Sequence, residues 1–241
     1  MPLPTCVVTI PVYKAVPSES EKVSLRQAAK ILHRYDICIF CPASLDVSIY
    51  LEICPKAQVV RFDDAYFEGI EGYNRLMFSP KFYRTFWKYD YLLIYQLDAY
   101  VFRDELLDWC QRSYDYVGAP WVIPPPLTKK PIVNLQKCFV GRVGNGGLSL
   151  RRVKSHYRNV VFFRPLLRFF LKNEDMFWGL ALYFLNPFFR RPSADEALYF
   201  AFELAPKQCY EKIGQLPFGV HAWQKYEPEF WGALIDAPKN D

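Results

Sequence analysis

Apolar runs and amphipathic stretches alternate along the first part of the chain. Two runs rich in Val and Ile, CVVTIPVY at 6–13 and DICIFCP at 36–42, are typical of strands buried on both faces. The segment 18–35 between them begins with capping residues and then places apolar residues at helical spacing, which predicts a helix. Together these segments predict a β-α-β unit.

The same pattern continues to residue 98. AQVVRFD at 57–63 is a further candidate strand, and the aromatic-rich segment 79–89 predicts a helix that leads into a fourth strand, YLLIYQLD at 91–98. Strands that alternate with helices in this way favour an α/β sandwich.

Turn-forming residues dominate the segment that follows. Residues 114–133 are rich in Pro and predict an irregular loop, a candidate for a mobile flap. After it, GNGGLSLRR at 144–152 predicts a glycine turn and a short strand, followed by a basic helix and a second helical stretch at 193–206. The chain has no internal repeat, and we expect one domain that spans residues 1–241.

Composition places the protein among globular domains. Hydrophobic residues make up 51% of the chain and charged residues 23%, which argues against a disordered or fibrous protein. The net charge of +5 falls short of the clustered basicity of dedicated nucleic-acid binders. We therefore expect no nucleic-acid partner, and a phosphorylated small molecule is a fitting ligand.

Cysteine usage and apolar segments indicate the compartment. Seven cysteines without framework spacing favour a reducing environment, and the lone CxxC formed by Cys38 and Cys41 is interpreted as two buried thiols rather than a zinc or redox site. The N-terminal sequence shows no signal-peptide pattern, and the apolar stretch 176–189 is shorter than the roughly 20 residues that a membrane-spanning helix needs. We expect a cytoplasmic protein without a membrane span.

Two features near predicted strand ends are candidates for ligand binding. Asp98 follows an apolar strand, and ligands of open α/β sheets bind outside the carboxyl ends of strands, although an aspartate there also begins ordinary turns. Gly144, Gly146 and Gly147 allow a ligand to approach the backbone closely, but the same residues suit a plain tight turn. Neither the Walker loop nor the GxGxxG fingerprint is present.

Two further features carry titratable side chains. Glu174 and Asp175 lie next to Trp178, and a carboxylate beside an aromatic platform suits sugar chemistry. Adjacent acids also occur at helix N-termini, where they meet the helix dipole. His221, in PFGVHAW, is one of three histidines, and by itself such a residue is more often structural than a ligand.

Taken in order, these segments resemble an uncharacterised bacterial family of glycosyltransferase-like domains of the GT-A type, found among polysaccharide-biosynthesis enzymes. The resemblance covers nearly the whole chain, and it implies an α/β/α sandwich with a mixed, mostly parallel central sheet. The segments that carry it are IPVYK, CPASLD, YFEGIEGYNRLM, FYRTFWKYDYLLIYQLDAYVF, DYVGAPW, VGNGGLSLR, NEDMFW, EALYFAFE and LPFGVHAW.

The resemblance implies a donor and metal site. In GT-A enzymes a DxD motif ends a strand and its last Asp binds a divalent cation. Here Gln96, Leu97 and Asp98 stand at that place, so Asp98 becomes a ligand for Mn²⁺ or Mg²⁺ and His221 the second protein ligand. Because Gln96 replaces the first Asp of the motif, we expect the cation to bind well only when the donor is also bound.

The resemblance also implies a catalytic pair. In inverting β-1,4-galactosyltransferases, a GG-containing strand precedes an ED motif whose Asp is the base. By that likeness Asp175 becomes the general base, and Glu174 a hydrogen-bonding partner of the acceptor. Asn145, Gly146 and Gly147 then form the floor beneath the donor sugar and the acceptor.

The remaining donor contacts follow from the same resemblance. Pro11, Val12 and Tyr13 match the strand edge that usually holds the nucleotide base, and Asn74 and Arg75 become contacts to the ribose or the phosphates. The expected reaction transfers a sugar from a nucleotide-diphosphate sugar, a UDP-sugar by preference, to a saccharide or lipid-linked saccharide acceptor.

Three alternatives stay open at this point. A retaining transferase on the same fold would use Asp175 to orient the acceptor, and a non-catalytic carbohydrate- or nucleotide-binding module would lack the chemistry. The cations and aromatics at 151–158, 164–172 and 188–192 raise a third alternative, a basic membrane-surface or nucleic-acid protein, although a solvated helix face explains them as well. Peripheral contact with the inner face of the cytoplasmic membrane is compatible with the main interpretation.

Overall fold

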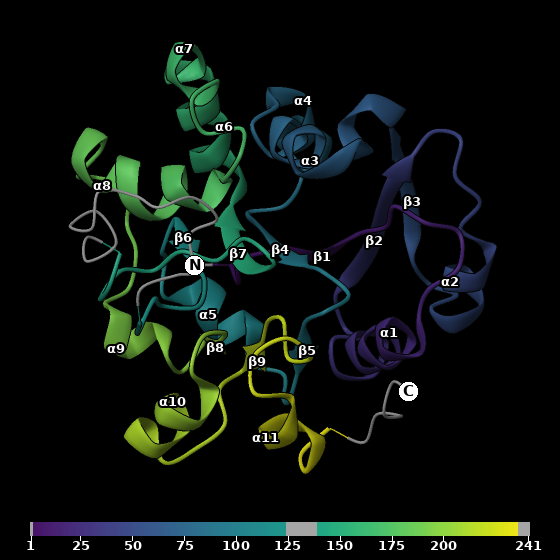
Figure 1. Cartoon of the computed structure of the whole chain (residues 1–241). Coiled ribbons are helices and arrows are strands. Elements are labelled where there is room, and N and C mark those ends of the chain that lie inside the picture. The colour runs from purple at the N-terminus through teal and green to yellow at the C-terminus, as the bar shows by residue number, and fades with distance from the viewer. Residues whose placement is uncertain (1, 124–138, 236–241) are drawn as a thin grey trace.

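Six strands form the central sheet of the protein. The computed structural model describes residues 2–123 and 139–235, and in it the strands have the order β3-β2-β1-β4-β7-β6 (Figure 1). Strands β1 to β4 run parallel, and β7 pairs antiparallel with both β4 and β6. The strands are β1 (Cys6–Pro11), β2 (Asp36–Pro42), β3 (Gln58–Phe62), β4 (Tyr91–Tyr95), β6 (Tyr116–Val117) and β7 (Leu148–Arg152).

Helices cover both faces of this sheet. Side chains of α1, α2 and α5 share a core with one face, and those of α3, α4 and α6 share a core with the other. Figure 1 shows α1 and α5 on the opposite side of the sheet from α3, α4 and α6. These helices are α1 (Glu19–Ile31), α2 (Ser48–Ile53), α3 (Gly69–Met77), α4 (Pro80–Thr85), α5 (Leu106–Gln111) and α6 (Val153–Phe162).

The alternation of side chains along β1 explains the two cores. Val8 and Ile10 pack against the α1 side, whereas Val7 packs against the α3 side, and all three are almost completely buried. Because both faces are covered, the strand is apolar on both faces except at Thr9, whose hydroxyl donates to the Leu93 carbonyl. At the start of α1, Ser18 and Glu21 form a capping box, as the sequence pattern predicts.

A small second sheet and several short helical segments complete the fold, most of them in the C-terminal third. The small sheet has the order β5-β9-β8. Its strands are β5 (Tyr100–Val101), β8 (Ala201–Phe202) and β9 (Gly219–Val220), and the remaining helical segments are η1 (Asp64–Phe67), α7 (Arg164–Leu167), the π-helical η3 (Met176–Ala181), α8 (Leu182–Leu185), α9 (Ala194–Ala197), α10 (Pro206–Ile213) and α11 (Pro228–Gly232).

The predicted helix at 193–206 is wrong in its second half. Only α9 is helical there, and the chain then extends into β8, which pairs with β9. Phe200, Ala201 and Phe202 are all fully buried. Three consecutive buried side chains suit a strand between two packed layers, whereas a surface helix would expose one of them.

The predicted loop at 114–133 contains more structure than its composition indicates. Tyr116 and Val117 form the edge strand β6, and Pro120 makes an isolated bridge with Val143. The remainder of the candidate flap, residues 124–133, lies outside the described residues. Cys38 and Cys41 are buried free thiols, as predicted. Across 2–123 and 139–235, no helix combines the length and apolarity needed to cross a bilayer.

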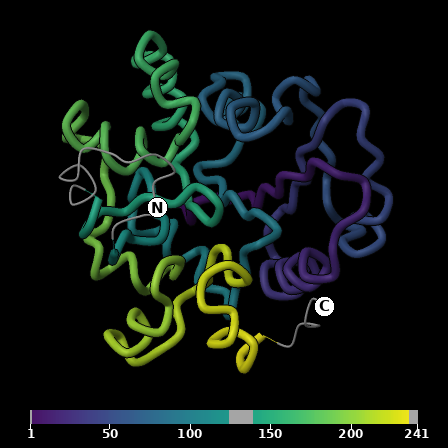
Figure 2. The backbone as a smooth tube through the Cα atoms, viewed as in Figure 1, coloured from purple at the N-terminus to yellow at the C-terminus, as the bar shows by residue number. Residues whose placement is uncertain are grey.

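The early and the late segments of the chain join in the middle of the central sheet. Figure 2 shows the early segments, purple to blue, on one side and the segments from β7 onward, green to yellow, on the other. They join where β4 pairs with β7, in a register that sets Tyr95 opposite Leu148. The carboxyl end of β4 therefore meets the glycines that precede β7.

Candidate functional site

A tight turn directly after β4 presents the QLD segment. The Gln96 amide donates to the Gly147 carbonyl (2.8 Å), which ties the turn to the glycine segment, and the Ala99 amide donates to the Gln96 carbonyl (2.9 Å). The amide of Trp223 donates to the carbonyl of Asp98 (3.4 Å) and brings the C-terminal segment to the same place. Asp98 therefore lies where three distant parts of the chain converge.

His221, which follows β9, faces oxygen atoms through both ring nitrogens. Its Nε2 lies 3.2 Å from Oδ1 of Asp98 and 3.3 Å from Oε1 of Gln96. Its Nδ1 lies 3.1 Å from Oε1 of Glu203 and 3.0 Å from Nδ2 of Asn145. Burial by itself disfavours the imidazolium, but the carboxylates of Asp98 and Glu203 hold the pKa of His221 well above its ordinary value. Burial likewise opposes ionisation of Asp98, and His221 outweighs it, so the pKa of Asp98 is lowered.

These residues fit a divalent cation. Oδ1 of Asp98 is buried and makes no hydrogen bond, although Nε2 of His221 is close. Two ligand atoms at about 2.1 Å from one cation lie roughly 3 Å apart, close to the separation seen here. Glu203 on the far nitrogen of His221 completes the carboxylate–imidazole arrangement typical of metal sites. Within the described residues, His, Cys, Asp and Glu form no metal-ready group of three or more, so a cation would need ligands from a bound substrate or water.

Two consecutive glycines separate this site from a pair of carboxylates. A Cβ on Gly147 would lie 1.9 Å from Nε2 of His221, and a Cβ on Gly146 would lie 2.4 Å from Glu174 and 2.6 Å from Oδ1 of Asp175. Any side chain at either position would therefore collide with a functional group. Asn145 fixes the turn, because its Oδ1 accepts from the Gly147 amide (2.8 Å).

Glu174 forms a buried ion pair with Arg151. The two nitrogens of the guanidinium reach the two carboxylate oxygens at 2.6 and 3.1 Å, and neither side chain is appreciably exposed. Arg151 also donates to Ser149 and Tyr83. The predicted contact of Glu174 with an acceptor stays a prediction, but its oxygens are already engaged in a structural pair that fixes the neighbouring Asp175.

We expect Arg151→Met to lower the free energy of unfolding by about 3–5 kcal/mol, because it leaves Glu174 as an unpaired buried charge. The double variant Arg151→Met, Glu174→Leu should recover most of that loss, since it removes both charges. Urea unfolding of the two variants and the wild type measures the difference. Equal midpoints for Arg151→Met and the wild type would contradict the role given to the pair.

Of the two adjacent carboxylates, Glu174 and Asp175, Asp175 is the one without a hydrogen-bond partner for one of its oxygens in the described part of the chain. It precedes the π-helical segment η3, and π-helical turns are common at functional sites. Its Oδ1 is buried and forms no hydrogen bond within the described residues. Burial, and then the charge of Glu174, raise the pKa of Asp175 to about 8, while Arg151 partly opposes the shift. Such a carboxyl group can accept a proton near neutral pH.

Asp175 and His221 line one cleft of about 710 Å³, and Asp98 lines an adjoining smaller pocket of about 170 Å³. Tyr13 and Gln96 line both. The cleft is lined by Tyr13, Phe67, Gly69, Ile70, Tyr73, Asn74, Gln96, Gly146, Gly147, Lys172, Asn173, Glu174, Asp175, His221 and Lys225. The smaller pocket is lined by Pro11, Val12, Tyr13, Lys14, Glu21, Tyr50, Gln96, Leu97 and Asp98.

The structure thus gathers most of the predicted residues at one place. Two are not in the lining: Asn145 lies behind it against His221, and Arg75 is exposed on α3 and reaches neither pocket. Asn74 lines the cleft, but its amide is already bound to the Leu171 carbonyl (2.8 Å).

Sequence reasoning missed Glu203 and Arg151. Glu203 directly follows β8, which is the same strand-end signal that singled out Asp98, but the erroneous helix at 193–206 concealed it. Arg151 lies in β7 on the face of the strand opposite to Leu148 and Leu150, and an arginine buried in a strand requires a carboxylate partner. That requirement points to the acids at 174 and 175.

Comparison with known structures places the fold. GlyE from Streptococcus pneumoniae TIGR4, a glycosyltransferase, superposes with a TM-score of 0.56 at 12% identity over 95% of this chain and 59% of that chain. An active-site mutant of LgtC superposes with a TM-score of 0.55 at 13% identity, over 98% of this chain and 97% of that chain. The bifunctional glycosyltransferase WbbM superposes with a TM-score of 0.55 at 12% identity, over 93% of this chain and 47% of that chain. This chain therefore spans about half to nearly all of these proteins, and it shares their GT-A-like fold.

Sequence comparison gives the family. No curated protein matches the sequence significantly. The sequence model of one family matches residues 56–221, an interval that includes Asp98, the glycine segment, Asp175 and Glu203 and ends at His221. The chain belongs to the family described as "Protein of unknown function (DUF5672)" and has a GT-A-like fold.

Proposed function

We propose that this chain is a glycosyltransferase that moves a sugar from a nucleotide-diphosphate sugar, a UDP-sugar by preference, to a saccharide or lipid-linked saccharide acceptor. One observation carries the proposal. Asp175, a carboxylate with an unpaired oxygen, and His221 line one cleft beyond the end of β4, and Asp98, which pairs with His221, lines the adjoining pocket. The general position of the cleft agrees with the rule that ligands of α/β sheets bind outside the strand ends. The likeness to solved glycosyltransferases supports the fold on which the proposal rests.

The two groups have separate roles in the proposed reaction. Asp175 accepts the proton of an acceptor hydroxyl, whose oxygen attacks the anomeric carbon. The bond from that carbon to the diphosphate breaks, the diphosphate leaves with the electron pair, and the configuration inverts. A divalent cation held by Asp98 and His221 would supply Lewis-acid stabilisation of the diphosphate charge.

The lining of the cleft supports this division. Lys172 and Lys225 are cations that line it and can attract the diphosphate. Tyr13 belongs to both pockets and lies near Phe67 and Tyr73, with ring centroids 6.4 and 6.5 Å away. An aromatic group at this boundary can stack on a base or a sugar.

Glu203 should tune the metal site without touching the metal. Its carboxylate contacts Nδ1 of His221, and loss of such an outer partner typically weakens metal binding about 10–100-fold. We expect Glu203→Gln to raise the Mn²⁺ concentration needed for half-maximal donor binding by that factor. Titration of Mn²⁺ at fixed UDP-sugar, followed by calorimetry, measures the shift. Glu196→Gln, which changes an acid that pairs with Arg112 near the surface, is the control. Unchanged metal dependence in Glu203→Gln would contradict this role.

The raised pKa of Asp175 predicts the pH dependence. Because the base must be deprotonated, kcat/KM should rise about tenfold per pH unit below the pKa and level off above about 8. The same pKa shift changes the free energy of unfolding in the opposite direction, so stability falls where the rate rises. The folded state holds this proton between the ordinary pKa of 3.8 and about 8, so the contribution of Asp175 to stability falls as pH rises through that interval. A pH–rate profile from Asp175→Asn should lack the rise, and a wild-type profile that falls from pH 6 to 8 would contradict the assignment.

A further inference from the structure

The excess positive charge of the protein lies in one segment. Residues 153–191 contain seven Lys and Arg and two acids, a net charge of +5 that equals the net charge of the whole chain. The rest of the sequence is therefore balanced. Neither acid offsets the surface charge, because Glu174 is buried against Arg151 and Asp175 lines the cleft. Six of these seven cations, all except the partly buried Arg191, thus face solvent without an opposing charge from the same segment.

The same segment carries the most exposed aromatic side chains. Within the described residues, all exposed phenylalanines lie between 162 and 188: Phe162 is 78% exposed, Phe169 69%, Phe184 69% and Phe188 87%. Val161, Leu166, Tyr183 and Leu185 are also exposed. Phe162, Leu185 and Phe188 gather around one pocket, and exposed apolar side chains that gather in this way mark an interaction site.

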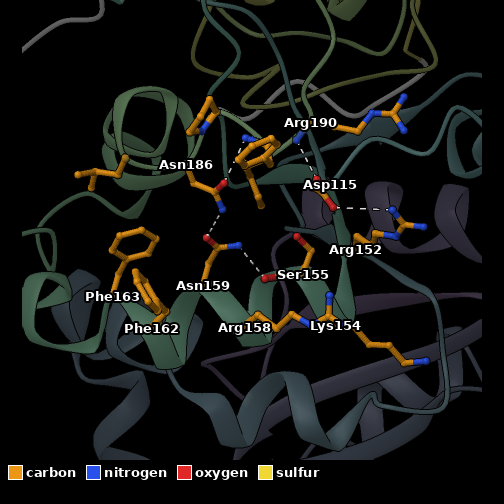
Figure 3. A pocket seen from close by; sticks show the side chains of 14 residues that line it. Asp115, Arg152, Lys154, Ser155, Arg158, Asn159, Phe162, Phe163, Asn186 and Arg190 are labelled. Carbon is orange, nitrogen blue, oxygen red and sulfur yellow. Dashed lines mark hydrogen bonds and ion pairs between the residues drawn. The ribbon is translucent and has the colours of Figure 1, made fainter.

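A pocket of about 900 Å³ joins the cations to the apolar side chains (Figure 3). It lies between α6 and the chain that follows α8. Figure 3 shows Phe162 and Phe163 at one end and Arg152 and Arg190 at the other. Its lining is Asp115, Arg152, Lys154, Ser155, Arg158, Asn159, Phe162, Phe163, Leu185, Asn186, Pro187, Phe188, Phe189 and Arg190.

Side-chain contacts hold the two walls of this pocket together. Asn186 donates to Oδ1 of Asn159 (3.0 Å), and Asn159 donates to the Ser155 carbonyl (2.9 Å). The one acid in the lining, Asp115, accepts from the Arg190 amide (2.8 Å). Lys154 and Arg158 form no ion pair within the described part of the chain, so their charges are available to a partner.

We propose that this face docks on a bilayer that contains anionic phospholipids. The α6–α8 surface is defined by Lys154, Arg158, Phe162 and Phe188, which all line the pocket. Charge complementarity favours this occupant, because the cations match anionic headgroups while phenylalanine tips enter the headgroup–acyl boundary. A duplex nucleic acid would engage the cations and leave the apolar tips in water. The docking goes beyond the proposed transfer chemistry and does not depend on it.

The pocket and the cleft lie toward opposite ends of the central strands. Arg152, which lines the pocket, pairs with Tyr91 at the start of β4, whereas the cleft lies beyond the end of β4. Residues 172–175, which join α7 to η3, line the cleft, so one segment connects the two places along the chain.

Vesicle co-sedimentation tests the proposal without donor or acceptor, so its failure leaves the transfer chemistry untouched. Vesicles of phosphatidylcholine alone are compared with vesicles that contain 30 mol% phosphatidylglycerol. We expect the wild type to bind only the anionic vesicles. Lys154→Glu with Arg158→Glu should reduce the partition coefficient at least about tenfold, and Phe162→Ser with Phe188→Ser by a similar factor.

Matched controls separate the surface from general charge and hydrophobicity. Lys56→Glu with Lys207→Glu makes the same change in net charge elsewhere, and Leu3→Ser with Val16→Ser removes apolar side chains that are 61% and 63% exposed. Both controls should bind like the wild type, and circular dichroism should show that all variants are folded. Equal binding to neutral and anionic vesicles, loss in the controls equal to that in the surface variants, or retention of an RNA duplex without retention of anionic vesicles would overturn the proposal.

Discussion

Asp175→Asn is expected to lower kcat by about 10²–10⁴ while leaving donor binding intact. The amide retains the shape of the side chain but cannot take the proton of the acceptor hydroxyl. Asp175 is suited to that task because its Oδ1 has no hydrogen-bond partner and its pKa is raised to about 8 by burial and by Glu174. Steady-state transfer assays with donor and acceptor measure the loss, and thermal shift with donor alone measures binding.

Asp195→Asn is the matched control for this substitution. Asp195 is an exposed aspartate that pairs with Lys212, so the control should keep full turnover. The anomeric configuration of the product, read by NMR, adds a second criterion. Full turnover of Asp175→Asn, or a product with retained configuration, would show that Asp175 does not act as the base in an inverting reaction.

Gly147→Ala is expected to abolish metal-dependent donor binding. The new Cβ would lie 1.9 Å from Nε2 of His221, so the imidazole must move away from Asp98 and Gln96. A displacement of about 1 Å can cost roughly 10² in rate even when the chemistry is intact. Thermal shift with a UDP-sugar, with and without Mn²⁺, measures the loss of the metal-dependent part.

Gly232→Ala provides the control for the glycine substitution. Gly232 lies in α11, has no positive φ, and a Cβ there would meet nothing within 4 Å. It should therefore behave like the wild type in every assay. If Gly147→Ala kept the same Mn²⁺-dependent shift as Gly232→Ala, the site between β4 and β7 would not be the donor site.

Local patterns in the sequence were sufficient to predict the fold class. Continuous apolar runs at β1, β2 and β4 require cover on both faces, and the helices between them supply it. The strand-end position of Asp98 likewise follows from one segment. The resemblance to GT-A enzymes added the expected partner His221, and the structure places its Nε2 3.2 Å from Oδ1 of Asp98.

Other parts of the site depend on contacts between distant segments. Glu203 reaches Nδ1 of His221 only because β8 and β9 pair, and the short strand β8 resembles a helix in sequence. Arg151 meets Glu174 across 23 residues, so neither the buried pair nor the shifted pKa of Asp175 is visible in a local pattern. Arg75 shows the converse case, since this cation next to Asn74 is exposed on α3 and lines neither pocket, and its contact with the donor stays a prediction.

The central claim is that this cleft binds and uses a nucleotide sugar. Nucleotide release from a panel of UDP-, GDP- and CMP-sugars, measured with Mn²⁺ and with EDTA, tests it most directly. The account predicts Mn²⁺-dependent release of UDP from at least one UDP-sugar by the wild type, and loss of that release in a variant that carries both Asp98→Asn and His221→Ala. A wild type that neither binds nor turns over any sugar nucleotide in the panel, or a double variant as active as the wild type, would contradict it.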